Sequence, residues 1–285
     1  MKIAILSFYS EKYYRGVETW ARNLKKHLSG IQIFSGWQSY NPLLWIKADI
    51  VVPANGRFQV LLARLFCKKI VVFGHSGPGA DDKWNLWCSP NIFVAFSSPQ
   101  AAWANKFKLP WTKIIVIPHA VDTKIFQPVN QKVIKNTVLC VASNDPNKRI
   151  NLVARAVALL PGVELVAVGQ GNPVQADWKD IPKIYQQAKV FCFVPWEREA
   201  FGLVFLEALA SNLPVVTIDD PIRREIVGEA GVFVKNPENI PDLAKAIKLA
   251  LQTDWKDKPR SQAEKFSWGI IAHQYLDLCK SLIHH

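Results

Sequence analysis

Several features that define other protein classes are missing from this sequence of 285 residues. Its five cysteines are scattered and form no CxxC pair, which argues against a disulfide framework and a structural zinc site. No run of about 18 apolar residues occurs, so we expect no transmembrane helix. The segment Met1–Leu6 lacks the longer apolar core and the cleavage site of a signal peptide. We therefore expect a cytoplasmic protein with reduced thiols.

Two common nucleotide-binding motifs are also missing. No GxGxxG follows a predicted strand, which argues against an NAD-dependent oxidoreductase, and the sequence contains no P-loop. Hydrophobic residues make up 49% and charged residues 20% of the chain, as in an ordinary globular protein. The length allows one large domain or two modest ones.

Positive charge is concentrated in the first half of the chain. Residues 1–134 hold 17 lysines and arginines against 6 aspartates and glutamates, whereas residues 135–285 hold 18 against 17. Tryptophans lie among the basic patches: Trp20, Trp37, Trp45, Trp84, Trp87, Trp103 and Trp111. This combination is typical either of a solvated surface or of a protein that binds the anionic inner face of a membrane. No nucleic-acid-binding module is recognisable, so we expect no nucleic-acid partner.

Short apolar segments alternate with segments of helical periodicity, a pattern typical of parallel α/β sheets with helices on both faces. The first half has predicted strands at 2–7, 31–34, 50–53, 70–74, 92–97 and 114–118. The second half has predicted strands at 137–142, 163–168, 190–194, 215–218 and 231–234. A polar break at 127–136 separates the two series, which predicts two Rossmann-like domains. A charged connector at 254–260 and an amphipathic helix at 267–282 follow them.

The most informative motif follows the predicted strand at 190–194. Glu199 lies in the loop, Gly202 begins a helix, and Glu207 lies further along that helix among apolar residues. Free backbone amides at a helix start attract phosphate or sugar oxygens. A carboxylate accepts two hydroxyl hydrogens at once, which suits a ribose diol.

Three segments resemble glycosyltransferase family 4, also described as glycosyl transferases group 1. Residues 195–216 are similar to that family's E-x7-E signature, residues 116–128 to its interdomain segment, and residues 16–24 to its N-terminal glycine loop and first helix. The match covers nearly the whole chain and is densest over residues 114–235.

The resemblance implies a GT-B fold: two facing Rossmann-like domains with parallel sheets and an interdomain cleft. Residues 1–134 would bind the acceptor and residues 135–253 the nucleotide-sugar donor. Residues 254–285 would form a connector and a helix that packs back on the N-terminal domain. The implied enzyme is a retaining glycosyltransferase of the hexosyltransferase type. It would use a UDP- or GDP-sugar and a lipid-linked or glycan acceptor, with no metal and no other cofactor.

The resemblance also implies roles for single residues. Transfer leaves negative charge on the β-phosphate, so catalysis needs donors placed where that charge develops. Lys148 matches the phosphate-binding lysine of the family. Glu199 would lie near the reacting centre, and Glu207 would bind the ribose. The backbone of Ala200, Phe201, Gly202 and Leu203 would hold sugar or phosphate oxygens.

Three further positions carry implied contacts. Gly16 matches the loop whose amides approach the diphosphate, and Gly169 would let the nucleotide approach a strand end. His75 matches the acceptor-side histidine, where it would contact the acceptor or the transferred sugar.

One departure from the family pattern bears on activity. Ala142-Ser143 stands where the family usually has Gly-Arg, so an arginine that assists the diphosphate is missing from its usual place. Arg149 or Arg198 would supply the charge instead. The alternatives are a nucleotide-sugar-binding protein without catalytic activity and a nucleotide-sugar epimerase, although the E-x7-E string argues against the epimerase.

Overall fold

The computed structural model describes residues 1–12, 16–54, 56–67, 69–129, 136–196 and 199–283. The chain forms two compact units. Unit 1 consists of Met1–His119 together with Trp268–His285, and unit 2 is Ala120–Ser267. Unit 1 is therefore built from both ends of the chain, whereas unit 2 is continuous.

The described residues of unit 1 form six short parallel strands. The first three, β1 (Ile3–Leu6), β2 (Ile31–Phe34) and β3 (Ile50–Pro53), pair in the order β2-β1-β3. The next three, β4 (Val71–Phe73), β5 (Ile92–Ala95) and β6 (Lys113–Val116), pair in the order β4-β5-β6. A parallel bridge between Val51 and Ile70 links the two sets. Most of these strands are buried on both faces, which explains their continuous apolar runs.

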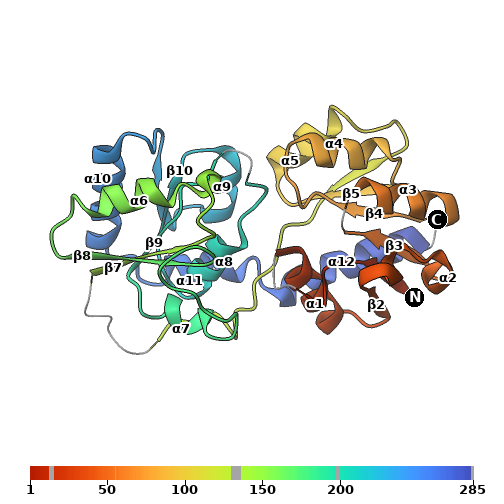
Figure 1. The fold of residues 1–285 in the computed structure, drawn as a ribbon, viewed down its shortest axis with the longest axis horizontal. Coiled ribbons are helices and arrows are strands. Elements are labelled where there is room, and N and C mark those ends of the chain that lie inside the picture. The colour runs from red at the N-terminus through yellow and green to blue at the C-terminus, as the bar shows by residue number, and fades with distance from the viewer. Residues whose placement is uncertain (13–15, 55, 68, 130–135, 197–198, 284–285) are drawn as a thin grey trace. The chain divides into compact units, whose positions relative to one another are not determined.

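Helices cover both faces of this sheet. Helices α3 (Arg57–Phe66), α4 (Ala80–Trp87) and α5 (Ser98–Asn105) lie on one side, and α2 (Pro42–Trp45) contacts α3. On the other side α1 (Gly16–His27) packs against α12 (Trp268–Ile283), as Figure 1 shows. The Trp20 Nε1 of α1 donates a hydrogen bond of 3.1 Å to the Tyr275 hydroxyl of α12. Both side chains are almost fully buried, so α12 is part of the core of unit 1.

Unit 2 has a five-stranded parallel sheet in the order β11-β10-β9-β7-β8. Its strands are β7 (Asn136–Val141), β8 (Val163–Val168), β9 (Val190–Cys192), β10 (Val215–Ile218) and β11 (Gly231–Val234). Helices α6 (Ile150–Val157) and α10 (Ile240–Gln252) contact each other and the sheet on one side. A second group of helices consists of α7 (Ile181–Tyr185), α8 (Leu203–Ala210), α9 (Pro221–Val227) and α11 (Lys258–Glu264).

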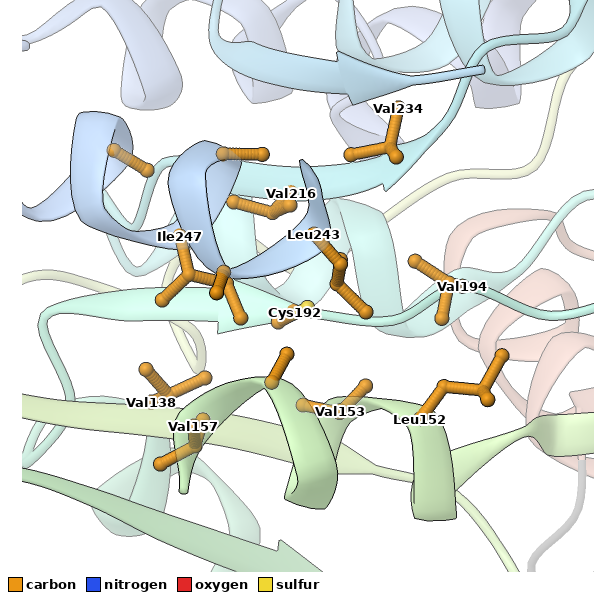
Figure 2. Packing of buried hydrophobic residues seen from close by; sticks show 14 of the residues in the cluster. Val138, Leu152, Val153, Val157, Cys192, Val194, Val216, Val234, Leu243 and Ile247 are labelled. Atoms are coloured by element: carbon orange, nitrogen blue, oxygen red, sulfur yellow. The ribbon is translucent and has the colours of Figure 1, made fainter. Parts of the chain in front are cut away.

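One hydrophobic core of unit 2 lies between its sheet and the pair α6 and α10, and further buried side chains such as Phe191 and Phe205 pack on the α8 side. Figure 2 shows apolar side chains from the two helices facing those of the strands: Val138, Leu152, Val153, Val157, Cys192, Val216, Leu243 and Ile247. All of them are less than 9% exposed. Burial of apolar side chains such as these is the dominant favourable contribution to folding.

Three helices, α2, α4 and α11, are missing from the sequence-based prediction. The segment predicted as a connector at 254–260 contains the start of α11, where Pro259 occupies the first turn and needs no hydrogen-bond donor there. Helix α4 was not predicted, because it directly follows the turn-forming residues 77–79. None of the helices in the described part of the chain has the length and hydrophobicity needed to span a membrane.

Candidate functional site

The topology of each sheet fixes where a ligand would bind. In unit 2 the chain leaves β7 toward β8, and it leaves the neighbouring strand β9 in the opposite direction, toward β10. Ligands of open α/β sheets bind at the carboxyl ends of the strands beside such a switch point. Here the segment after β7 carries Lys148 and the segment after β9 carries Glu199, so two of the three predicted catalytic residues lie at one switch point, whereas the third, His75, belongs to unit 1.

Lys148 and Glu199 form an ion pair. The Nζ of Lys148 lies 2.6 Å from Oε2 of Glu199, although the two residues are 51 positions apart. The side chains are 33% and 20% exposed, so a ligand can reach both. The lysine ammonium also lies 5.9 Å from the centre of the Phe193 ring. The Lys148 ammonium is therefore already held in place for an anionic ligand, and the Glu199 carboxylate lies beside it.

A buried arginine holds the backbone at Glu199. Arg223 is fully buried, and its Nη1 donates a hydrogen bond of 2.8 Å to the backbone carbonyl of Glu199. Its Nη2 lies 2.7 Å from Oδ2 of Asp220, so its charge is paired. The sequence analysis missed this residue, because an arginine in a short polar helix usually lies on the surface. The signal that could have found it is Asp220, an N-cap aspartate three residues before it.

The start of α8 is a turn that requires glycine. Gly202 is the N-cap residue, with a φ of +86°, and a Cβ there would lie 2.7 Å from the Phe205 ring. The same Cβ position lies 3.7 Å from Cγ of Glu199, so the helix start and the Lys148–Glu199 pair are adjacent. The first amides of a helix lack partners within that helix. The backbone of Leu203 and its neighbours can therefore offer donors to a ligand next to Glu199.

The residues just before Gly202 anchor this turn. Phe201 is buried and its ring packs edge-on against Phe266 at 6.3 Å, whereas Ala200 is partly exposed. The predicted backbone contacts of Ala200, Phe201, Gly202 and Leu203 thus start from one short segment beside Glu199.

Glu207 lies within α8, further along the helix from Gly202. The Tyr185 hydroxyl donates a hydrogen bond of 2.9 Å to Oε2 of Glu207. Burial raises the pKa of this carboxyl to about 7, and the hydrogen bond from Tyr185 opposes the rise. Within the described part of the chain the other oxygen has no hydrogen-bond partner, so it is available to a hydroxyl group. Tyr185 is a second residue that sequence reasoning did not find.

Gly169 is explained by packing between two loops. Its φ is +131°, and a Cβ would lie 2.2 Å from the carbonyl oxygen of Ala142. The loops after β7 and β8 are joined here, since Asn172 Nδ2 donates to that same carbonyl at 2.7 Å. The glycine thus has a structural reason at this position, and its predicted contact with a nucleotide stays a prediction.

Two arginines were expected to replace the arginine missing at Ser143, and only Arg149 lies among the described residues. Arg149 follows Lys148 in a left-handed conformation with a φ of +52°, and its guanidinium lies 3.2 Å from Glu238 and 5.1 Å from the centre of the Trp196 ring. Arg198 lies outside the described residues. Ser143, where the family arginine would be, is partly exposed in the loop after β7.

The remaining predicted residues belong to unit 1. Gly16 is exposed at the first position of α1. His75 follows β4 and lies among aromatic rings, 4.9 Å from that of Trp20 and 5.0 Å from that of Phe96. Burial lowers the pKa of His75 to about 3, so the imidazole is neutral at physiological pH. Among the described residues no group of three or more His, Cys, Asp or Glu side chains gathers as metal ligands would.

Comparison with known proteins adds the family context. Residues 173–266, which include Glu199 and Glu207, match the family model described as Glycosyl transferases group 1. The O-antigen chain mannosyltransferase B of Escherichia coli is 33% identical over 109 residues, which are 36% of this chain and 28% of that protein. The curated relatives that match are covered over only 28% to 52% of their own length.

Solved structures match over the whole chain. Sucrose-phosphate synthase from Thermosynechococcus elongatus has a TM-score of 0.82 and 18% identity, covering 100% of this chain and 99% of that one. HepE of Anabaena, solved in complex with UDP and glucose, has a TM-score of 0.79 and 16% identity, covering 99% and 100%. The predicted fold class is confirmed: the chain has the GT-B fold of glycosyltransferases, with parallel, Rossmann-like sheets, and its residues 173–266 match the glycosyl transferases group 1 family.

Proposed function

We propose that this protein is a glycosyltransferase that moves a sugar from a nucleotide-sugar donor to an acceptor hydroxyl. The observation that carries the proposal is the Lys148–Glu199 pair at the switch point of unit 2, inside a chain with this fold and this family match. The bond between the anomeric carbon and the phosphate oxygen breaks, and a bond from that carbon to the acceptor oxygen forms. The acceptor proton leaves with the nucleoside diphosphate or enters solvent.

The proposed donor site lies in unit 2. Lys148 binds the diphosphate and stabilises the charge that grows on the leaving phosphate, where a preplaced cation lowers the barrier most. The amides at the start of α8 hold sugar or phosphate oxygens, and Glu207 accepts hydrogen bonds from the ribose. Arg223 holds Glu199 in place and thereby keeps its carboxylate beside Lys148. A uracil base is favoured, since the similar HepE was solved with UDP and with UDP-glucose.

The proposed acceptor site lies in unit 1, with His75 as a contact, and transfer retains the anomeric configuration. Analysis of the product's anomeric proton coupling tests the retention. The alternative is a protein that binds nucleotide sugars without transferring them. It is favoured by Ser143 in place of arginine and by Arg149, whose guanidinium pairs with Glu238.

Calorimetric titration with UDP, GDP, ADP and CMP tests the donor site first. We expect one nucleoside diphosphate to bind and Glu207→Ala to lose that binding. Glu229→Ala is the matched control, because Glu229 is an exposed residue of the same unit, outside the site. Sugar conjugates of the nucleotide that binds then enter a transfer assay. Turnover supports the enzyme, and tight binding without turnover or hydrolysis supports the alternative.

We further propose that unit 1 docks on an anionic membrane surface and that the acceptor is lipid-linked. Unit 1 holds 16 lysines and arginines against 6 aspartates and glutamates. Large apolar side chains are exposed near α2 and α3: Trp37 (81%), Leu43 (83%), Phe58 (67%) and Leu65 (78%). Two of the predicted interfacial tryptophans, Trp20 and Trp45, are buried in the core and take no part. Exposed apolar side chains beside a basic surface suit the headgroup region.

Vesicle sedimentation at low salt tests the docking. We expect binding to vesicles with phosphatidylglycerol and none to phosphatidylcholine alone. The double variant Phe58→Ser and Leu65→Ser should bind less strongly, with Leu159→Ser, an exposed leucine of unit 2, as the control. Equal binding by the double variant and the wild type would place the contact elsewhere, and no binding at all would remove the membrane from the proposal.

A further inference from the structure

Unit 1 has a cavity of about 380 Å³ at the edge of its sheet that faces away from the carboxyl ends of the strands. Its lining includes Ala48 and Asp49, which directly precede β3, and Lys69, which shortly precedes β4. The cavity therefore lies at the amino ends of these strands. Ligands of open α/β sheets usually bind at the carboxyl ends, where His75 follows β4, so this cavity is a separate feature.

Most of the lining is apolar and open to solvent. Ile46 after α2, Phe66 at the end of α3 and Ile283 at the end of α12 all contribute exposed side chains. Figure 1 shows the ends of these three helices together at one end of unit 1. An apolar ligand that entered the cavity would remove these side chains from water, which is favourable. The lining thus favours a hydrocarbon group as the occupant.

The volume of the cavity indicates how long that hydrocarbon is. A water molecule takes roughly 30 Å³ in the liquid and a methylene group is of similar size, so the cavity holds a chain of about ten carbons. A single apolar side chain from a protein partner would leave much of that volume empty. Atoms that line an empty volume lose their packing contacts, so a longer chain fits better than a side chain.

The charged groups at the cavity favour an anionic headgroup. The carboxylate of Asp49 already accepts a hydrogen bond of 2.7 Å from the backbone amide of Lys2. The ammonium of Lys69 donates to the carbonyl oxygens of Leu282 and Ile283 at the end of α12. Within the described part of the chain no carboxylate pairs with that ammonium. A negatively charged group beside the cavity would therefore be attracted to Lys69.

Exposed apolar residues connect the cavity with the face that is proposed to dock on a membrane. Phe58, Leu61 and Leu65 recur at helical spacing along α3, and all three are exposed. Helix α3 follows β3, so it runs from the carboxyl ends of the strands to the cavity at their amino ends. Lipid that contacts this side of α3 would also lie at the mouth of the cavity.

We propose that the cavity binds one acyl chain of an anionic membrane lipid, with Lys69 facing the headgroup. The membrane as the source of the chain rests on the proposed function, whereas binding of the chain itself does not. The bound chain anchors unit 1 at a defined point and takes no part in sugar transfer. Docking then depends on one specific contact as well as on the general positive charge of unit 1.

Saturated fatty acid anions of six to fourteen carbons, each below its micelle concentration, test the cavity. Binding is measured as protection of Cys67 from iodoacetamide, because Cys67 lines the cavity and the other four cysteines are buried. We expect the affinity to rise about fourfold with each added methylene group and to level off near about ten carbons. Unspecific partitioning would keep rising with chain length. Decyltrimethylammonium, with a similar chain and the opposite charge, should bind more weakly than decanoate.

One substitution in the lining separates the cavity from the rest of the surface. Ile46→Asp should weaken decanoate binding about tenfold or more, because it places a negative charge on the apolar wall. Ile270→Asp, at an exposed isoleucine of α12 outside the cavity, should leave the binding unchanged. Thermal unfolding checks that both variants fold. If Ile46→Asp does not, Ala48→Phe replaces it, because the larger side chain fills the cavity.

Vesicles that contain phosphatidylglycerol test the source of the chain. They should protect Cys67 in the wild type, and Ile46→Asp should sediment with them less strongly. Protection by fatty acids without protection by these vesicles would overturn the membrane as the source.

Four other results overturn the cavity itself: no protection of Cys67 by any fatty acid, an affinity that still rises at fourteen carbons, tighter binding of the cation, or equal binding by Ile46→Asp and the wild type. The nucleotide titration runs in parallel. Binding of a chain without a nucleotide refutes only the donor site, and binding of a nucleotide without a chain refutes only the cavity.

Discussion

The carboxyl of Glu207 makes the stability of unit 2 depend on pH. Burial raises its pKa from 4.5 to about 7, so the folded chain keeps a proton that the unfolded chain has already released. The resulting contribution to stability is fully present below the unfolded pKa and is lost as the pH rises through the folded pKa. Ionisation of the Glu207 carboxyl therefore lowers the free energy of unfolding, even though the Tyr185 hydroxyl donates a hydrogen bond to it.

Glu207→Gln removes this titration and keeps an oxygen that accepts the Tyr185 hydrogen bond. For a carboxyl with these two pKa values, the linkage relation gives a loss of about 2 kcal/mol between pH 5.5 and pH 8. We therefore expect the wild type to lose about 2 kcal/mol of unfolding free energy relative to the variant over this interval.

Urea unfolding at both pH values, followed by tryptophan fluorescence, measures the difference. Comparing the two proteins at each pH cancels the titration of the other groups. Glu229→Gln, an exposed glutamate of the same unit, is the control and should follow the wild type. If the difference between wild type and Glu207→Gln is the same at both pH values, the carboxyl titrates normally and the reasoning is refuted.

Three further substitutions probe the site and its support. Lys148→Met should lower transfer or donor hydrolysis about 10²–10³-fold and cost less than about 1 kcal/mol of stability, because the Lys148–Glu199 pair is partly exposed; an unchanged rate would remove the lysine from catalysis. Arg223→Met should cost about 3 kcal/mol in urea unfolding, since it leaves an aspartate without its buried partner, and a loss under 1 kcal/mol would contradict that role. Gly169→Ala should cost about 2–4 kcal/mol, seen as a lower melting temperature, because its Cβ has no space and its φ is positive; an unchanged melting temperature would mean that the two loops can separate.

Much of the fold could be predicted from the sequence, because buried parallel strands leave uninterrupted apolar runs. The strands at Ile31–Phe34 and Ile50–Pro53 have the predicted bounds, and every predicted strand has a counterpart. Helix α4 could not be predicted in the same way. It is short, follows a Gly-Pro-Gly turn, and buries Asp82, which accepts a hydrogen bond from Gln100 of α5, a contact that no local pattern encodes.

The candidate site, like the fold, could be predicted from the sequence only in part. The adjacency of Lys148 and Glu199 follows from the rule that neighbouring parallel strands end at one edge of the sheet. The supporting residues Arg223 and Tyr185 act across distances of 24 and 22 positions, and only the folded chain brings them to Glu199 and Glu207. Gly169 was assigned to a ligand, but the close approach of a neighbouring loop already requires glycine there.

The division of unit 1 between the two ends of the chain has a consequence for synthesis on the ribosome. Trp20 emerges early, yet the hydroxyl that its indole contacts belongs to Tyr275, 255 residues later. Unit 2, being continuous, has its whole sequence available while unit 1 still lacks one of its helices. Until α12 has been translated, the apolar surface of unit 1 that receives it stays uncovered. The first unit to be translated is therefore the last to be completed.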